Sequence, residues 1–305
     1  MRGCVSASAV IALLVVSGCD ELQRSITPLD LVPGDAVAVV EFRWREARAE
    51  PALRQMAEFP PSFAHITELD LPIDAIQSVV VFTRALSATA GETLIMKAEG
   101  LGSRFTAVAG AARWTVVPVG GADVYLAPGP GNAAAIAVGD SILVAGPRES
   151  IDKFASEPRK LGAFVARTEF ADVRDVMGDS SPIGFALAWP ADIADRSRLA
   201  VAMSAGFMKF AGHGTLGDIV GQLGIGRAYV VRLRPQPGGL HYTVAGVMQD
   251  EDTASTVSGG LSLLKSLASM VPDYARQGPP DPTSTLTVER TGAVVRIGML
   301  VPEKK

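Results

Sequence analysis

The chain has 305 residues, of which 48% are hydrophobic and 20% are charged, and its formal net charge is -4. This is the composition of a folded globular protein, and it excludes a disordered or collagen-like chain. The mild acidity, together with the lack of any Lys/Arg run in the sequence, argues against a nucleic-acid partner and against a polybasic contact with anionic lipid.

The first residues have the layout of a secretory signal. Arg2 precedes an apolar run from Val10 to Val16, and Ser17 and Gly18 then stand directly before Cys19. A positive end, an apolar middle and small residues at a cleavage site are the three parts of such a signal. The run is too short for a transmembrane helix, which needs about 20 residues. An ordinary cleaved signal with a cysteine nearby remains the alternative.

The V-S-G-C sequence that ends at Cys19 resembles a bacterial lipobox, and the resemblance covers residues 1–20. It implies that residues 1–18 are removed and that Cys19 is acylated and becomes the new N-terminus. Two or more acyl chains make attachment stable, because each buried methylene contributes about 0.8 kcal/mol. Asp20 implies retention at the inner membrane by the enterobacterial rule. Because that rule varies among bacteria, either the cell membrane or the outer membrane is possible.

The 2 cysteines of the sequence, Cys4 and Cys19, both belong to this signal region. The mature chain therefore has no thiol for a disulfide, a zinc–thiolate site or an iron–sulfur cluster. No histidine has a second ligand at helical spacing, so we expect neither a metal nor a cofactor. The acidic residues 250–252 lack the calcium-loop pattern and indicate a helix N-cap instead.

Hydrophobic periodicity predicts the elements in chain order. A short tether at 19–33 precedes a strand at 36–43, a helix at 46–58, a helical piece at 63–69, strands at 78–84 and 92–99, a helix at 104–111, hairpins at 114–127 and 134–145, and a helix at 147–156. The strand at 92–99 alternates between apolar and polar residues, which predicts one buried and one exposed face.

The second half has a similar order. It is predicted to contain a strand at 183–189, a helix at 191–210, strands at 228–234 and 240–248, a helix at 253–271 and a hairpin at 285–301. By eye, 79–84 matches 229–234, 92–100 matches 241–249, and 114–128 matches 285–302. We therefore expect an α+β fold of two related modules, at 34–158 and 163–302, with mostly antiparallel sheets and packed helices. A chance match between two α+β segments is the alternative.

The sequence L-V-P-G-D-A-V-A-V-V-E-F, from Leu31 to Phe42, is similar to the start of repeated α+β modules in uncharacterised bacterial surface proteins. This resemblance agrees with the predicted organisation. It implies no known activity or site.

Two short motifs resemble catalytic signatures. A-M-S-A-G around Ser204 resembles a nucleophile elbow, but it lies in a helix-like run rather than in the required strand-to-helix turn. Ser262 and Lys265 match S-x-x-K without its accompanying motifs. A membrane-proximal serine hydrolase that uses Ser204 or Ser262 is the alternative function.

Two further features suggest ligand binding. The apolar Met203, Phe207, Met208 and Phe210 precede a glycine-rich stretch and are suited to a flap over a hydrophobic pocket. The alternative is ordinary core followed by a connector, which the general rule for apolar stripes favours. Alternation places Arg232 and Arg234 on one face of a strand, where His241 joins them if the registers agree. That face could hold an anion or be a solvated outer face.

The sequence therefore predicts a membrane-anchored envelope lipoprotein that faces the periplasm or exterior. We expect a non-enzymatic binding or scaffolding role, with the membrane, a protein or a hydrophobic ligand as partner. The sequence names no specific ligand, partner or oligomeric state.

Overall fold

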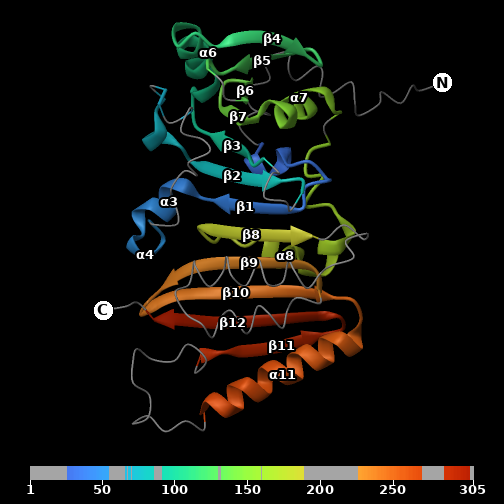
Figure 1. Ribbon diagram of the computed structural model, residues 1–305. Coiled ribbons are helices and arrows are strands. Elements are labelled where there is room, and N and C mark those ends of the chain that lie inside the picture. Colours follow the sequence, from blue (N-terminus) through green and yellow to red (C-terminus); the bar gives the residue numbers. More distant parts are fainter. Residues whose placement is uncertain are drawn as a thin grey trace, which may run out of the picture. The chain divides into compact units, whose positions relative to one another are not determined.

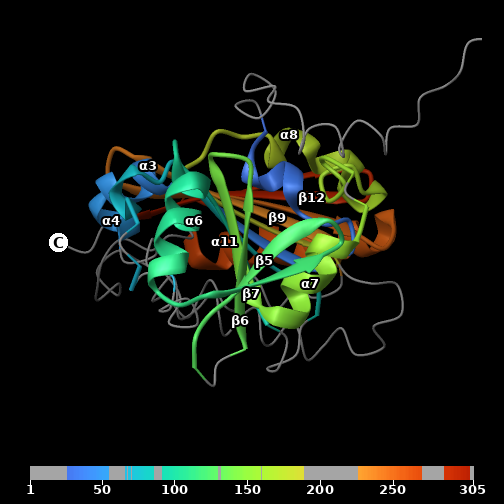
Figure 2. The same ribbon diagram turned by 90° about the horizontal axis from the view of Figure 1, so that it is seen from above.

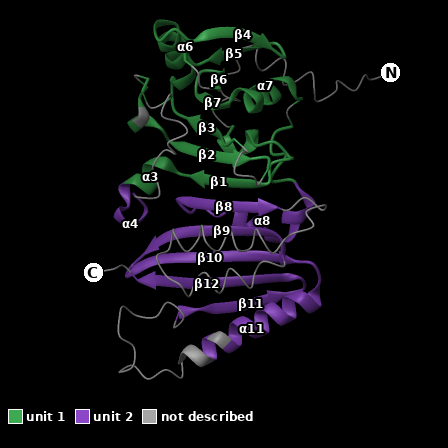
Figure 3. Cartoon of the chain, viewed as in Figure 1, with its two compact units in different colours: residues 1–48, 57–166 green, residues 49–56, 167–305 purple. Residues whose placement is uncertain are grey.

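The computed structural model of the protein describes residues 26–54, 66, 68–69, 71–85, 91–129, 132–158, 160–188, 226–269 and 285–302 (Figure 1). The chain divides into two compact units, which Figure 3 shows in different colours. Unit 1 comprises residues 1–48 and 57–166, and unit 2 comprises residues 49–56 and 167–305. In both units the described strands are antiparallel and helices pack on them, which confirms the predicted α+β class.

The described strands of unit 1 lie in the order β1-β2-β3-β7-β6-β5-β4, and every neighbouring pair is antiparallel. Their bounds are β1 Ala38–Phe42, β2 Ser78–Thr83, β3 Thr93–Lys97, β4 Thr115–Val119, β5 Ala122–Leu126, β6 Ala133–Val138 and β7 Ile142–Pro147. Gly120 and Gly121 turn β4 into β5 with φ of 58° and 84°. This left-handed conformation favours glycine, as the sequence predicted for a hairpin at this point.

The central strand β3 is buried on both faces. Thr93 and Lys97 are polar residues of the alternation at 92–99, which predicted an exposed face for them, but Thr93 is 2% exposed, so that prediction was wrong at Thr93. At the other end of the strand, η1 (Pro28–Leu31) packs on β2 and β3, and the Lys97 Nζ donates a hydrogen bond of 2.5 Å to the Ile26 carbonyl. Around Lys97 this face is thus covered by a segment distant in sequence.

Residues 26–33 therefore belong to the fold of unit 1 rather than to a free tether. Thr27 and Asp30 form a capping box, in which the Asp30 carboxylate accepts from the Thr27 N–H at 2.8 Å and the Thr27 hydroxyl accepts from the Asp30 N–H at 3.3 Å. Pro28 and Leu31 are buried. The capped turn fixes the chain on the sheet from Ile26 onward.

Two helices of unit 1 pack on either side of β6 and β7. α6 (Leu101–Ala111) and α7 (Arg148–Ser156) both pack on β6 and β7, on opposite sides as seen in Figure 2. Phe105 of α6 is fully buried, and its ring meets the rings of Trp114 and Tyr125 edge-on at 5.4 and 5.2 Å. Such geometry contributes to aromatic packing beyond the area buried.

The helix predicted at 46–58 is interrupted. α3 spans Trp44–Ala49 and α4 spans Pro51–Arg54, with Glu50 between them. Pro51 has no N–H to donate and its ring clashes with the preceding turn, so it starts a new helix instead of continuing the old one. The remainder of that prediction, most of the predicted piece at 63–69 and the predicted helix at 191–210 lie outside the described residues.

The described strands of unit 2 follow the order β8-β9-β10-β12-β11, again all antiparallel. Their bounds are β8 Ile183–Ala188, β9 Gly226–Gln236, β10 Gly239–Met248, β11 Thr287–Thr291 and β12 Val294–Pro302. η4 (Thr168–Val173) and α8 (Arg174–Met177) pack on β9, while α11 (Glu251–Ser269) packs on β10, β11 and β12. Figures 1 and 2 show α8 and α11 on opposite sides of these strands.

Five described strands have the same order in both units, and unit 1 continues with β5 and β4. β1, β2 and β3 correspond to β8, β9 and β10, α6 corresponds to α11, and the β6–β7 hairpin corresponds to β11–β12. The sequence matched 285–302 with 114–128 instead, and this was wrong: β12 pairs with β10 as β7 pairs with β3. Two successive hairpins look alike in sequence, and only long-range pairing shows which one joins the earlier strands.

Candidate functional site

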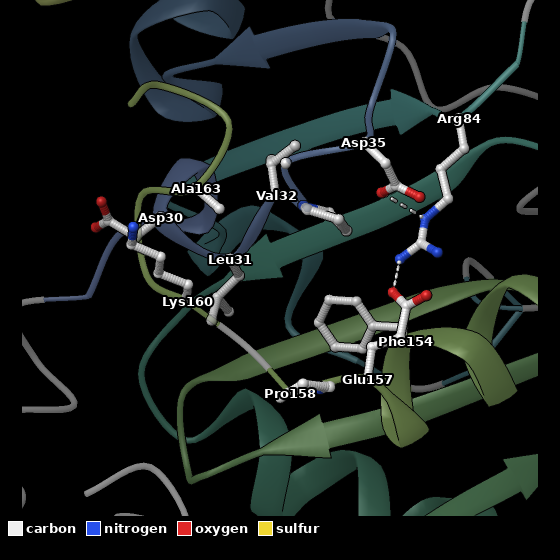
Figure 4. A pocket seen from close by; sticks show the side chains of 12 residues that line it. Asp30, Leu31, Val32, Asp35, Arg84, Phe154, Glu157, Pro158, Lys160 and Ala163 are labelled. Atoms are coloured by element: carbon white, nitrogen blue, oxygen red, sulfur yellow. Dashed lines mark hydrogen bonds and ion pairs between the residues drawn. The ribbon is translucent and has the colours of Figure 1, made fainter. Parts of the chain in front are cut away.

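A pocket of about 410 Å³ lies within unit 1, between the N-terminal segment and the region around the end of α7 (Figure 4). Its volume falls within the range of roughly 300–1,000 Å³ that is usual for small-molecule sites. The residues that line it are Asp30, Leu31, Val32, Pro33, Gly34, Asp35, Arg84, Phe154, Glu157, Pro158, Lys160 and Ala163.

The apolar walls of the pocket come from the N-terminal segment and from α7. Leu31, Val32 and Phe154 are 7%, 1% and 2% exposed, so their positions are fixed by the core rather than by solvent. The Gly162 N–H donates to the Asp30 carbonyl at 2.8 Å, which holds the turn after α7 against η1. A Cβ at Gly34 would lie 3.4 Å from the Ala163 Cβ, so the two segments are in close contact at the pocket floor.

Four charged side chains form a closed ring at one end of the pocket. The Arg84 Nη2 donates to Glu157 at 2.9 Å, and its Nε lies 3.4 Å from Asp35. Lys153 lies 3.0 Å from Asp35 and 3.6 Å from Glu157. The Arg84 side chain is 15% exposed, whereas the other three are 41–49% exposed. The Arg84 guanidinium is thus the most buried member of the ring. It links Asp35, near the start of the described chain, to Glu157, which follows α7.

Two donors at the pocket have no ion pair or hydrogen bond of their own within the described residues. The Arg84 Nη1 is buried and lacks a hydrogen-bond partner there. Lys160 is exposed, and its amine forms no ion pair with any residue that the structure describes. By contrast, the Lys97 amine donates a hydrogen bond to the Ile26 carbonyl. Burial lowers the pKa of Lys97, and the nearby Asp30 carboxylate offsets only part of that shift.

Sequence reasoning missed this pocket. The segment 30–35 falls partly in the predicted tether at 19–33, and residues 159–162 lie between the two predicted modules. Two residues in the sequence could have indicated this site. One is Asp35, the acidic residue that follows Pro33 and Gly34, and the other is Arg84, a cation at the end of an otherwise apolar strand. Asp35 and Arg84 meet only in the folded chain, where Arg84 also pairs with Glu157, 73 residues further along the sequence.

The structure places the predicted cationic face in unit 2. Arg234 and His241 are partners in the β9–β10 register, so they share a face with Arg232, as predicted. The expectation that this face is solvated was wrong at Arg232, which is 5% exposed because η4 and α8 cover it. The Arg232 Nε donates to the Val176 carbonyl at 3.0 Å.

The neighbouring Arg234 also has a structural partner. Its Nη2 donates to the Asp179 carboxylate at 2.5 Å, and the Ser181 hydroxyl donates to the same oxygen at 2.9 Å. Burial raises the pKa of Asp179, but these hydrogen bonds outweigh it and hold that pKa below its usual value. His241 is half-buried beside Gly298. The arginines thus hold the covering helices in place.

The apolar quartet Met203, Phe207, Met208 and Phe210 lies outside the described residues, as does Ser204. Ser262 and Lys265 are exposed on α11, and the Ser262 hydroxyl makes no hydrogen bond to a base within the described residues.

Asp250 acts as the N-cap of α11. Its carboxylate accepts from the Thr253 N–H at 2.7 Å, and hydrogen bonds from Thr253 lower its pKa. This is the role that the sequence indicated in place of a calcium site. Over the described ranges, no group of three or more His, Cys, Asp and Glu side chains is arranged to hold a metal ion. Likewise, none of the helices in those ranges has the length and apolar character required to span a membrane.

Comparison with known proteins assigns no family. No family model matches the chain, and no curated protein matches it. Among solved structures, crystal form III of TP0453 is similar, with 11% identity and a TM-score of 0.47 over 91% of this chain and 95% of that chain. Crystal form IV of TP0453 gives the same identity and TM-score over 93% and 96%. A likeness at this level assigns neither an activity nor a ligand to this chain.

Proposed function

We propose that this chain is an exported lipoprotein of the bacterial envelope, held at a membrane by lipid on Cys19, and that its unit 1 binds a small ligand there. The observation that carries the anchor is the signal that ends in V-S-G-C at Cys19. A positive start, a short apolar run and small residues before that cysteine fit export followed by acylation.

The start of the fold supports the binding part of the proposal. The described fold begins at Ile26, seven residues after Cys19, and a chain of seven residues spans at most about 25 Å. The pocket is lined by residues 30–35, which follow directly from this segment. The ligand site of an acylated chain therefore lies within a short reach of the bilayer.

The chemistry of the pocket favours binding over catalysis. Asp35 and Glu157 serve as acceptors for Arg84 and Lys153, so these carboxylates are committed to ion pairs. Walls formed by Leu31, Val32 and Phe154 beside a few charged groups are the usual lining of a ligand site. We propose a non-enzymatic role on this basis, with a scaffolding partner as a second use of the same anchored body.

Metabolic labelling with a palmitate analogue tests the anchor. We expect the wild-type chain and Cys4→Ala to be labelled and recovered with membranes, while Cys19→Ala is unlabelled. Cys4→Ala is the matched control, because it removes the other cysteine of the same signal. An unlabelled wild-type chain, or full-length chain in the cytosol, would refute the anchor.

Purification of the acylated protein from its native membrane tests the binding role. Mass spectrometry of the co-purified lipids and proteins should identify a specific ligand or partner, and Ala163→Phe, which fills the pocket, should lose a ligand bound there. Recovery of no specific molecule would count against binding.

A further inference from the structure

Strand β4 ends the strand order of unit 1, with β5 as its neighbour on one side. Among the described strands none pairs with its other edge, and Figure 1 shows β4 at the outer end of that unit's strands. The sequence of β4, T-V-V-P-V, carries no charge and is rich in β-branched residues, which favour strands. Val116 is 48% exposed. An uncharged, exposed edge of this kind is a template for pairing with another strand.

The register of the β4–β5 hairpin shows which backbone groups of β4 point away from β5. The two-residue turn at 120–121 makes Val119 and Ala122 a hydrogen-bonded pair. Hydrogen-bonded and non-hydrogen-bonded pairs alternate along an antiparallel ladder. Val116 and Pro118 therefore occupy non-hydrogen-bonded positions, and their backbone groups face the free edge.

The hydrogen bonds of the next strand agree with this assignment. The Ala127 N–H donates to the Ala133 carbonyl of β6 at 3.0 Å. Tyr125 lies two residues earlier in the same ladder, so its backbone groups also point toward β6. They consequently point away from Val116, which is the partner of Tyr125 in β4.

The free edge of β4 thus offers an incomplete set of hydrogen-bonding groups. Val116 presents both an N–H and a C=O, whereas Pro118 presents only a C=O because proline has no N–H. Proline in a sheet is found at outward-facing edge positions of this kind. Pro118→Thr would supply a second donor two residues from the first, which is the spacing of an antiparallel ladder.

We infer that Pro118 keeps the β4 edge of one copy of this chain from pairing with the β4 edge of another. An antiparallel edge is complementary to a second copy of itself about a two-fold axis. When Val116 of each copy faces Pro118 of the other, only two hydrogen bonds form, one from each Val116 N–H. In Pro118→Thr the same pairing has four. The inference depends neither on the proposed ligand site nor on the lipid anchor.

Sedimentation equilibrium of the chain from Asp20 onward tests this role of Pro118. That chain keeps every described residue and has no cysteine, so a dimer of it cannot be a disulfide. We expect Pro118→Thr to dimerise about 5-fold to 150-fold more tightly than wild type, because two hydrogen bonds are gained. Pro118→Ala, which restores the N–H without a β-branched side chain, should dimerise as well. Pro128→Thr is the matched control, because it removes an exposed proline outside the strands, and it should behave as wild type.

A second substitution locates the contact between copies. Val116→Lys added to Pro118→Thr should return the protein to the monomer, because it brings one lysine from each copy to the shared edge, where like charges repel. Residues 116 and 118 are exposed, so urea denaturation should show that each variant folds. The inference is overturned if Pro118→Thr and Pro118→Ala associate no more than wild type. It is also overturned if association survives Val116→Lys or is reproduced by Pro128→Thr.

Discussion

Gly184 in β8 should tolerate no side chain as long as Arg232 occupies its present position. The two residues are partners in the β8–β9 register, and a Cβ at Gly184 would lie 1.9 Å from the Arg232 Nη1 and 2.7 Å from its Cζ. The guanidinium therefore crosses directly over the glycine. Alanine at this position would force the side chain of Arg232 to move.

The cost of that movement follows from what Arg232 does. Its Nε donates to the Val176 carbonyl at 3.0 Å in a site where the residue is 5% exposed. A hydrogen bond to a charged group contributes about 1.5–3 kcal/mol, so Gly184→Ala should lower the free energy of unfolding by about that amount. In an Arg232→Met background the same change should cost much less, because a shorter, uncharged side chain has no such bond to lose.

Urea denaturation of the four chains in this double-mutant cycle measures the coupling. Gly259→Ala in α11 is the matched control, because no atom lies within 4 Å of its added Cβ. It should stabilise the protein by about 0.5–1 kcal/mol through helix propensity. If Gly184→Ala costs the same with and without Arg232, the steric argument is wrong.

Three other predictions concern unit 1 and the cap of α11. Phe105→Ala should cost about 3–5 kcal/mol in urea denaturation, because the ring is fully buried between Trp114 and Tyr125; a loss below 1 kcal/mol would contradict its place in the core. Arg84→Met should cost about 1–2 kcal/mol and Lys153→Met less than about 1 kcal/mol, since only Arg84 is largely buried and the carboxylates are partly exposed; equal losses would show that burial is irrelevant. The pKa of Asp250 lies below its ordinary value of 3.8, so its stabilisation is full well above that pH and disappears as pH falls through the lower folded value. Asp250→Ala should therefore be less stable than wild type at pH 7 and converge with it in acid, and a difference that persists at low pH would exclude the carboxylate as the cause.

Several local features were predictable because their causes lie within a few residues. The strands at 78–83 and 183–188, the hairpin turn at Gly120 and Gly121, and the cap at Asp250 follow from hydrophobic runs and from local hydrogen bonds. The class of the fold followed as well, because the order of these elements is itself a property of the sequence.

The candidate site was not predictable, because its parts meet only through tertiary contacts. Lys97 looked like a solvent-facing residue until η1 covered it, and Arg232 looked like a solvated cation until α8 accepted its hydrogen bond. The role of Arg84 follows from its ion pairs with Asp35 and Glu157, which lie at opposite ends of unit 1 in the sequence. Periodicity records which face of a strand is apolar, but it does not record which distant segment covers the other face.

The sequence by itself determined the likeness of Cys19 to a lipidation site and the alternation of strands and helices, since both are written in short stretches of chain. Tertiary structure alone decided that the segment 26–33 packs on the sheet of unit 1 and that a pocket forms beside Arg84. It also decided that the β6–β7 hairpin, and not β4–β5, is the counterpart of the last hairpin. The physical reason is that strand pairing and ion pairing depend on which surfaces remain free after the rest of the chain has packed, and neighbouring residues do not determine this.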